Sequence, residues 1–490
     1  MWERNCGDLG SNIRKTERRL RLLGARRPLF REAGSTRVEL RKTLGWPHLL
    51  ALGVGAIVGT GIYTLTGVGV DRAGPAVVLA FFVAGCVCVC AALAYTEMAS
   101  LIPESGGAYT YSYCVLGERI AWIVGWSLIL EYSLACSSVA VGWSGYLVGW
   151  LQSLGLVLPP QLLAGPHDGG IVNAPAIAVS LIVAGLLSAG TRESATLNII
   201  LVAIKLSALL LFVALALPAF NPDLMVPFAP YGFGSSEIAG ETRGVMAAAA
   251  IVFFAFYGFD AVATSAEEAK NPNRDLKIGI LGSMALCTVI YIFVALSAVG
   301  AVDHQALGES SEPLAFVLKT LEHPFAAWLV GLAALVALPT VVLVMMYGQS
   351  RIFYSMARDG LLPQSLAKVS DRKGTPVVVT ILTGIFVALV AGFFRLDEIA
   401  ELANAGTLLA FIATALSMIV LRGTRPDLNR PFKCPSPYLV GILAIFGCAY
   451  LIASLPTRTL ERFLMWNLIG LGLYAIGKLA IKFRAARSTR

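Results

Sequence analysis

Long apolar stretches separated by short polar segments make up most of the chain. Twelve of these stretches lie near the length of about 20 residues with which a helix spans a lipid bilayer. They cover residues 46–68, 73–98, 119–150, 171–190, 196–218, 244–266, 276–302, 325–357, 375–394, 398–421, 437–455 and 460–484. The pattern predicts an all-α polytopic membrane protein with about 12 transmembrane helices.

The composition agrees with this prediction and excludes the main soluble classes. Of the 490 residues, 57% are hydrophobic and 14% are charged, whereas an ordinary soluble domain has about 25% charged residues. A soluble protein of this size could not cover so much apolar surface with polar groups. Soluble enzymes, nucleic-acid-binding proteins and disordered scaffolds are therefore excluded, and no nucleic-acid partner is expected.

The positive charges indicate how the predicted helices are oriented. Of the 38 Lys and Arg residues, 31 fall in the N-terminal tail and the segments on its side of the membrane, and 6 fall in the opposite loops. Because positive residues favour the cytoplasmic side, both termini are predicted to be cytoplasmic, with a basic tail over residues 1–42. We expect a multi-pass protein of the plasma membrane, such as a bacterial inner membrane.

Two of the predicted spans are interrupted in a similar way. The first reads GVGAIVGTGIYTLTG and is interrupted by Gly53, Gly55, Gly59 and Gly61, and the sixth contains Gly258 and Asp260 in AAAAIVFFAFYGFDAVATSAEE. Glycine weakens a helix, and an acidic residue within a span usually faces a cavity. Since the interruptions fall in the first and the sixth span, five spans apart in order, the chain is predicted to contain two inverted five-helix repeats, 43–218 and 219–424, followed by two helices in 425–490. Such paired interruptions mark the substrate site of a transporter.

The first interruption has the chemistry to bind both charged ends of an amino acid. If the helix is unwound at Gly59, Thr60 and Gly61, the following half-helix exposes free N–H groups and a positive dipole end to a carboxylate. Carbonyls freed around Ile57 and Val58 suit an ammonium group. Packing of small residues between helices is the alternative interpretation.

The sixth span offers a second set of backbone acceptors. An unwound segment through Phe254, Ala255 and Tyr257 would supply carbonyls for the remaining ammonium hydrogens, and the Phe254 ring is a candidate lid, or gate, over the site. Asp260 follows Gly258 by two residues, where it could cap the restarted half-helix.

Four motifs follow one another along these spans. They are GAIVGTGIY, YTEMASLIPESGGAYTYSY, FFAFYGFDAVATSAEEAKNP and SRIFYSMARDGLLP. Together they resemble the amino acid–polyamine–organocation superfamily, most closely the cationic amino acid transporters and their bacterial proton-coupled relatives. The resemblance runs from about Lys42 to Arg484. It implies the LeuT-type fold, with a 5+5 inverted repeat and two extra C-terminal helices.

The resemblance also implies roles for individual residues. It places the amino-acid site at Ile57, Gly59, Thr60, Gly61, Phe254, Ala255 and Tyr257. Lys205 in the fifth span would occupy the place of a sodium ion in sodium-coupled relatives and act in coupling. Glu97 would hold a contact of the cytoplasmic gate.

Two further positions keep two interpretations each. Glu131, in the middle of the third span, either tunes the pocket toward cationic side chains or pairs with another buried polar group. Met345, next to Met346 in the eighth span, is either a pocket wall residue or ordinary helix packing.

These observations predict a secondary active amino acid transporter that works by alternating access, with the proton as coupling ion. An amino acid exchanger, a sodium-coupled symporter and a non-transporting amino acid sensor are the alternatives. A membrane-embedded enzyme is disfavoured because the four histidines are scattered, and no metal site or cofactor is expected. The lipid bilayer and an amino acid are the expected partners, with a broad substrate range that favours small neutral amino acids. The oligomeric state is left open.

Overall fold

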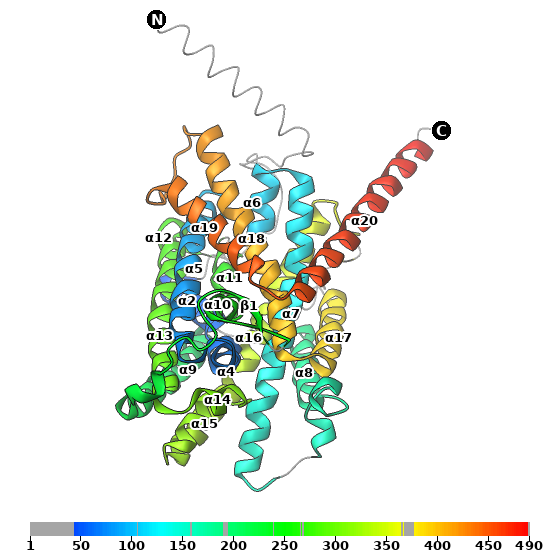
Figure 1. Cartoon of the computed structure of the whole chain (residues 1–490). Helices are drawn as coiled ribbons and strands as arrows, with labels where there is room; N and C mark the ends of the chain where they lie inside the picture. Colours follow the sequence, from blue (N-terminus) through cyan, green and yellow to red (C-terminus); the bar gives the residue numbers. More distant parts are fainter. Residues whose placement is uncertain are drawn as a thin grey trace, which may run out of the picture.

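Helices form nearly all of the regular structure. The computed structural model describes residues 44–104, 106–156, 159–189, 195–238, 240–264, 266, 269–363, 366 and 377–488 (Figure 1). The basic tail predicted over residues 1–42 lies outside the described residues. The strands of the described part form one antiparallel hairpin, β1 (Ser236–Ile238) and β2 (Glu241–Arg243).

Most of the helices occur in the places that the apolar stretches predict, and a few short ones lie in the segments between those stretches. In the first half they are α2 (Trp46–Ile57), α3 (Thr60–Tyr63), α4 (Leu65–Ala73), α5 (Val77–Leu101), α6 (Ala108–Val115), α7 (Glu118–Ser153), α8 (Ala174–Ala189) and α9 (Ala195–Ala216). In the second half they are α10 (Val245–Val252), α11 (Phe259–Thr264), α12 (Pro272–Lys277), α13 (Ser283–Ala301), α14 (His304–Gly308), α15 (Pro313–Thr320), α16 (Pro324–Arg358), α17 (Val377–Phe393), α18 (Leu396–Thr424), α19 (Pro437–Ala453) and α20 (Thr457–Ser488).

Short turns of other helix types connect these elements. The 3₁₀ turns are η1 (Gly74–Ala76), η2 (Pro160–Leu162), η3 (Pro166–Asp168), η4 (Leu217–Ala219), η5 (Pro222–Met225) and η6 (Phe253–Ala255). A π-helical turn, η8 (Ile278–Gly282), joins α12 to α13.

The all-α polytopic class is confirmed, whereas the number of spans is not settled by the helix lengths. Within the described residues, 7 helical segments are long and apolar enough to cross a membrane, or 8 if the bent pair of α19 and α20 counts as one span. The remaining apolar helices α2, α8 and α17 are shorter. Their shortness has a visible cause in α2, because the first predicted span is broken after Ile57. Twelve spans therefore stay a prediction.

Helices that hold the same place in the two predicted repeats pack against each other. Extensive contacts join α2 to α11, α5 to α13, α7 to α16, and α8 to α17. The long helices α7 and α16 form the tightest of these pairs, and α18 packs on both α7 and α5. The two broken helices are thereby held at the centre of the bundle.

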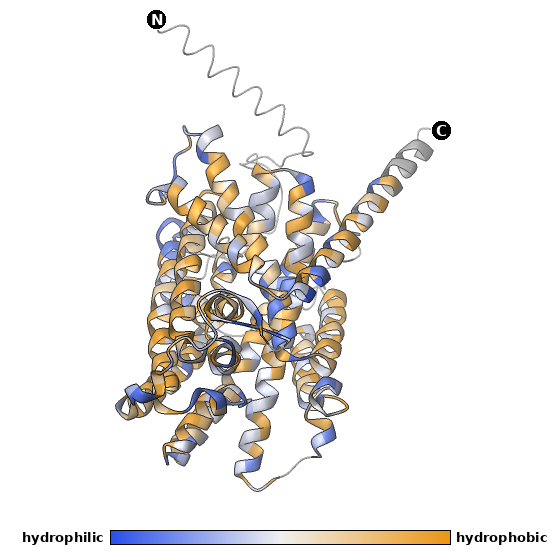
Figure 2. Cartoon of the chain, viewed as in Figure 1, coloured by the Kyte–Doolittle hydropathy of each residue, from blue (hydrophilic) through white to orange (hydrophobic). Residues whose placement is uncertain are grey.

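The outer faces of the bundle are apolar. Figure 2 shows hydrophobic residues over most of the helix surfaces, with hydrophilic ones in the loops, at the helix ends and in a group beside the start of α20. Large apolar side chains such as Ile182, Leu389 and Phe446 are 54–70% exposed. An apolar surface of this extent suits contact with lipid rather than water.

The last helix leaves the body of the bundle at an angle (Figure 1). The axes of α19 and α20 are bent by 112°. The start of α20 is fixed to α7 by stacked rings of Trp126 and Trp466, whose centroids lie 4.7 Å apart. Each of these indoles also donates to the backbone carbonyl of the other residue, at 2.9 and 3.0 Å.

Candidate functional site

The first helix break lies between α2 and α3. The helix ends at Ile57, Val58 and Gly59 are extended, and α3 begins at Thr60. Within the described residues, the N–H groups of Gly59, Thr60 and Gly61 have no backbone acceptor. The Thr60 hydroxyl is buried and has no hydrogen-bond partner there either. Four unpaired donors thus meet at the start of a half-helix, as the sequence predicted for a carboxylate site.

The second break lies between α10 and α11. The helix tightens into η6, and the chain then turns through Gly258, whose φ of +112° is a conformation that glycine adopts without strain. The carbonyls of residues 254–257 accept no backbone hydrogen bond within the described part of the chain. The amide of Asn404 in α18 donates to the freed carbonyls of Ala250 and Ile251, at 2.8 and 3.1 Å.

Backbone contacts without intervening side chains join the two breaks. A Cβ atom at Gly61 would lie 2.2 Å from the Cα of Ala255, and one at Gly258 would lie 2.9 Å from the carbonyl carbon of Ala56. Both glycines are therefore required by close packing of one half-helix on the other. For Gly61 this matches the packing interpretation that the sequence left open.

One of the carbonyls assigned to an ammonium group already has a partner. The hydroxyl of Tyr291 in α13 donates to the Ile57 carbonyl at 2.9 Å. The acceptors left at the centre are therefore the Val58 carbonyl and those of the second break. Sequence reasoning missed Tyr291 and Asn404, although a polar group in the middle of an apolar helix is the signal that could have found them.

Apolar side chains of α16 and of the second break line the remaining sides of the space between the two breaks. Val341 in α16 would contact a Cβ atom at Gly59 at 3.5 Å, and Met345 follows one turn later on the same helix face. The rings of Phe254 and Tyr257 meet edge-to-face with centroids 4.7 Å apart. All of these side chains are buried, so the centre is closed to both ends of the bundle.

Lys205 reaches the first broken helix from α9. Its side chain is 1% exposed, and its Nζ donates to the Gly55 carbonyl at 2.9 Å. The Tyr63 hydroxyl beyond the break donates to the Lys205 carbonyl at 3.2 Å. The residue thus contacts both sides of the first break, through its ammonium on one side and its backbone on the other.

Two acidic residues are buried beside the second break. Asp260 accepts from the Gly258 N–H at 3.2 Å and from the Tyr132 hydroxyl at 2.7 Å, so it caps the restarted half-helix as predicted. Glu131 in α7 interacts with Asp260. Neither carboxylate oxygen of Glu131 has a hydrogen-bond partner among the residues that the structure describes.

Ion pairs close the end of the bundle that carries α6 and α12, which is the upper end in Figure 1. The Glu97 carboxylate near the end of α5 accepts from Arg422 in α18, at 2.6 and 2.7 Å. Arg430 adds a contact of 3.2 Å, and the backbone N–H of Cys434 donates at 2.8 Å. Burial raises the pKa of the Cys434 thiol to about 12, so the thiol is neutral beside this cluster.

A second buried ion pair lies towards the opposite end of the bundle, where α14 and α15 are found. Arg72 at the end of α4 pairs with Glu401 in the first turns of α18. The Thr459 hydroxyl of α20 donates to the other carboxylate oxygen at 2.7 Å. The two ends of α18 are therefore tied by ion pairs, one to α5 and the other to α4.

The ion-pair cluster around Glu97 can be tested through the accessibility of the neighbouring Cys434 thiol. Arg422→Gln should increase the labelling of Cys434 by a membrane-impermeant maleimide. Loss of a buried ion pair costs about 3–5 kcal/mol, and Cys434 is 3% exposed in the closed cluster, where its N–H donates to Glu97. Cys434 labelling is measured by peptide mass spectrometry. Arg425→Gln, which removes an exposed pair with Asp427, is the matched control. Equal labelling of the two variants would show that the cluster is no gate.

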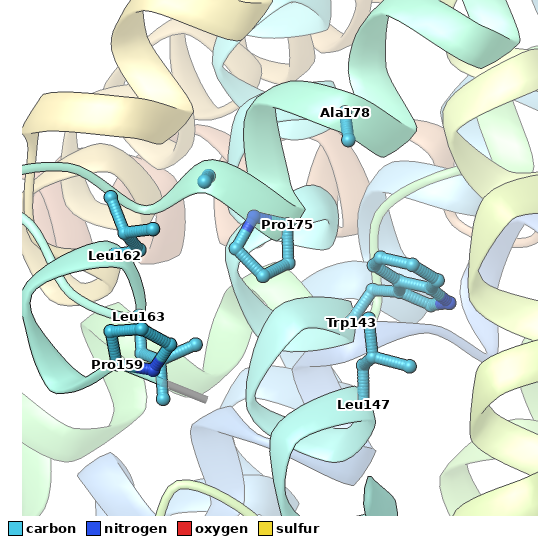
Figure 3. Close-up of a pocket in the computed structure, with 8 residues that line it drawn as sticks. Trp143, Leu147, Pro159, Leu162, Leu163, Pro175 and Ala178 are labelled. Atoms are coloured by element: carbon cyan, nitrogen blue, oxygen red, sulfur yellow. The ribbon is translucent and has the colours of Figure 1, made fainter. Parts of the chain in front are cut away.

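A separate apolar cavity lies between α7 and α8 (Figure 3). It has a volume of about 340 Å³ and is lined by Trp143, Leu147, Pro159, Leu162, Leu163, Ala174, Pro175 and Ala178. The indole N–H of Trp143 already donates to the Leu335 carbonyl at 2.9 Å. The cavity offers no polar group to an amino acid and does not belong to the centre between the two breaks.

An all-α membrane protein with two interrupted helices facing each other at its centre has the features of a secondary transporter. The sequence profile of the amino acid permease family matches residues 44–475. The chain belongs to this family, which confirms the resemblance found in its motifs.

Characterised relatives agree with this membership. The branched-chain amino acid permease BcaP of Bacillus subtilis (strain 168) is 44% identical over 446 residues, which are 90% of this chain and 94% of that protein. The methylthioribose transporter of the same organism is 38% identical with the same coverage. The vacuolar cationic amino acid transporter 2 of Arabidopsis thaliana is 37% identical over 79% of this chain and 61% of its own length. The family and these relatives are permeases and transporters, not enzymes.

Proposed function

We propose that the protein is a proton-coupled secondary transporter of amino acids that works by alternating access around the two helix breaks. The observation that carries this proposal is that unpaired backbone donors at one helix break lie close to free backbone acceptors at the other. The first break presents unpaired donors at Gly59, Thr60 and Gly61, and the second presents free carbonyls over residues 254–257. Donors and acceptors in one buried centre fit the carboxylate and the ammonium of an α-amino acid.

The helix contacts support a LeuT-type fold with a 5+5 inverted repeat. In this proposal the first repeat runs from α2 to α9, the second from α10 to α18, and α19 and α20 are the two additional helices. Contacts between corresponding helices, such as α7 with α16 and α8 with α17, are expected where a pseudo-two-fold axis relates the repeats. The charge bias of the loops favours a cytoplasmic upper end in a plasma membrane.

The two ion-pair clusters would act as gates. Opening towards the cytoplasm would require Glu97 to leave Arg422, and opening outward would require Arg72 to leave Glu401. Because the two pairs lie at opposite ends of α18, each can break while the other holds. That is the minimum requirement for alternating access to a site between them.

The walls of the centre favour a neutral substrate. Val341, Met345 and Phe254 present apolar surface, and the buried Glu131 interacts with Asp260. The names of the relatives include branched-chain and cationic amino acids. We propose a range of neutral amino acids that extends from alanine to leucine. Lys205 fills the position beside Gly55 with its own ammonium group, which favours the proton over sodium as coupling ion.

A competition assay tests the substrate class. Purified protein in proteoliposomes preloaded with unlabelled leucine should exchange radiolabelled leucine, and external alanine and leucine should compete. Lysine and arginine should compete at least 10-fold more weakly, because an apolar wall leaves a charged side chain unpaired. Strong competition by arginine and lysine alone would contradict the proposed substrate class.

A further inference from the structure

Glu131 and Asp260 form a carboxylate pair in the interior of the bundle. Glu131 projects from the middle of α7 and is 1% exposed, and Asp260 stands at the start of α11 and is 5% exposed. The two carboxylates interact with each other. Gly406 of α18 packs directly on this part of α7, since a Cβ atom there would lie 3.1 Å from that of Glu131. Both carboxylates are therefore shielded from bulk water in this closed structure.

No positive side chain compensates the pair within the described part of the chain. The titratable groups that face it are tyrosines: Tyr95 from α5, Tyr111 from α6, Tyr132 from α7 and Tyr257 from the second break. The Cys136 thiol lies beyond Tyr257. The nearest hydroxyl of α18, that of Thr407, donates to the Ala403 carbonyl at 3.2 Å. Two ionised carboxylates whose charges repel each other in such buried surroundings would be very costly.

The hydrogen bonds differ between the two carboxylates. Asp260 accepts from the Tyr132 hydroxyl at 2.7 Å and from the Gly258 N–H at 3.2 Å, and it stands at the N-terminus of a half-helix. These donors stabilise a negative charge. Among the described residues, no donor forms a hydrogen bond to either oxygen of Glu131. A proton held by the pair is therefore best placed on Glu131, with Asp260 as the ionised partner.

We propose that Glu131 and Asp260 are a proton-binding site beside the second helix break, with Glu131 protonated in the closed state and ionised when the site opens to water. Deprotonation releases one proton to solvent and leaves Glu131 as a carboxylate. The site is distinct from Lys205, which contacts the first break from α9. Two hydrogen bonds connect the site to the second break, one from the Tyr132 hydroxyl to Asp260 and one from the Gly258 N–H to Asp260. A role of this site in coupling rests on the proposed function, whereas the presence of a proton on Glu131 does not.

Infrared spectroscopy of the purified full chain in lipid nanodiscs, without substrate, tests the proton directly. A difference spectrum between neutral and alkaline pH should contain the carbonyl-stretch band of one buried protonated carboxylic acid. Glu131→Gln should remove this band. Glu401→Gln is the matched control, since Glu401 is equally buried but paired with Arg72, and it should keep the band.

Isotope labelling covers the case in which Glu131→Gln does not fold. In the unmodified protein, ¹³C-labelled glutamate should shift the band and ¹³C-labelled aspartate should leave it in place. Absence of the band at neutral pH, its persistence in Glu131→Gln, or its shift with aspartate labelling would overturn the assignment. Because no transport step is involved, these outcomes are independent of whether the protein moves amino acids.

Discussion

Lys205→Met should abolish the acceleration of amino acid uptake by an inward proton gradient while leaving substrate binding measurable. The ammonium of Lys205 holds the Gly55 carbonyl at 2.9 Å, immediately before the first break. The neutral methionine side chain is of similar length and fills the space, but it cannot donate this hydrogen bond in the inward-facing or the outward-facing state. If protonation of Lys205 shifts the first broken helix between its conformations, it should change the affinity for the substrate. A change of about 5–150-fold is typical when the binding of one ligand alters that of another.

The measurement is initial uptake in proteoliposomes with and without the gradient, alongside substrate-dependent thermal stabilisation of the purified variant. Lys319→Met is the control, because Lys319 lies at the end of α15, is substantially exposed and pairs with Glu312. It should keep the response to the gradient. An uptake rate that rises in Lys205→Met as in the unmodified protein would remove Lys205 from the coupling mechanism.

Gly59 and Gly61, which lie two positions apart, should respond to alanine in different ways. Gly61→Ala places a Cβ atom against the backbone of Ala255, 2.2 Å from its Cα. Overpacking of this kind costs about 1–3 kcal/mol, and more where backbone must move. We expect a lower melting temperature and loss of uptake, because the two half-helices can no longer meet.

Gly59→Ala should leave the fold intact and weaken the binding of the substrate. The added methyl group would meet Val341 at 3.5 Å, an ordinary contact distance, and φ at Gly59 is in the extended region. It would narrow the space beside the unpaired N–H groups, and one methyl group in a pocket changes affinity by about 10–200-fold. Thermal melting with and without leucine measures both effects. An unchanged leucine-dependent shift in Gly59→Ala would contradict a site at this break.

The sequence could predict where the helices are interrupted, because the cause is local. Glycine at positions 59, 61 and 258 and the acid at 260 mark the breaks by residue type alone. The apolar stretches likewise predicted helices close to their observed bounds, such as 119–150 for α7 (Glu118–Ser153). The sequence predicted one break in the first span, and the structure divides this span twice, into α2, α3 and α4.

The partners of the polar groups could not be predicted, because they are far apart in the chain. Glu97 meets Arg422 across 325 residues, and the Ile57 carbonyl meets Tyr291 across 234. Each pairing depends on how helices pack, which a single sequence does not specify. The same holds for Glu131, since Asp260, with which it interacts, belongs to the other predicted repeat. Its two sequence-based interpretations could be weighed only once the surrounding tyrosines were in place.

Leucine accumulation in proteoliposomes tests the central claim, proton-coupled amino acid transport, most directly. With an alkaline interior, radiolabelled leucine should accumulate inside above its external concentration and run out when a protonophore collapses the gradient. The account predicts both the accumulation and its collapse. Leucine that only equilibrates across the membrane, or enters solely in exchange for an internal amino acid whatever the gradient, would contradict it.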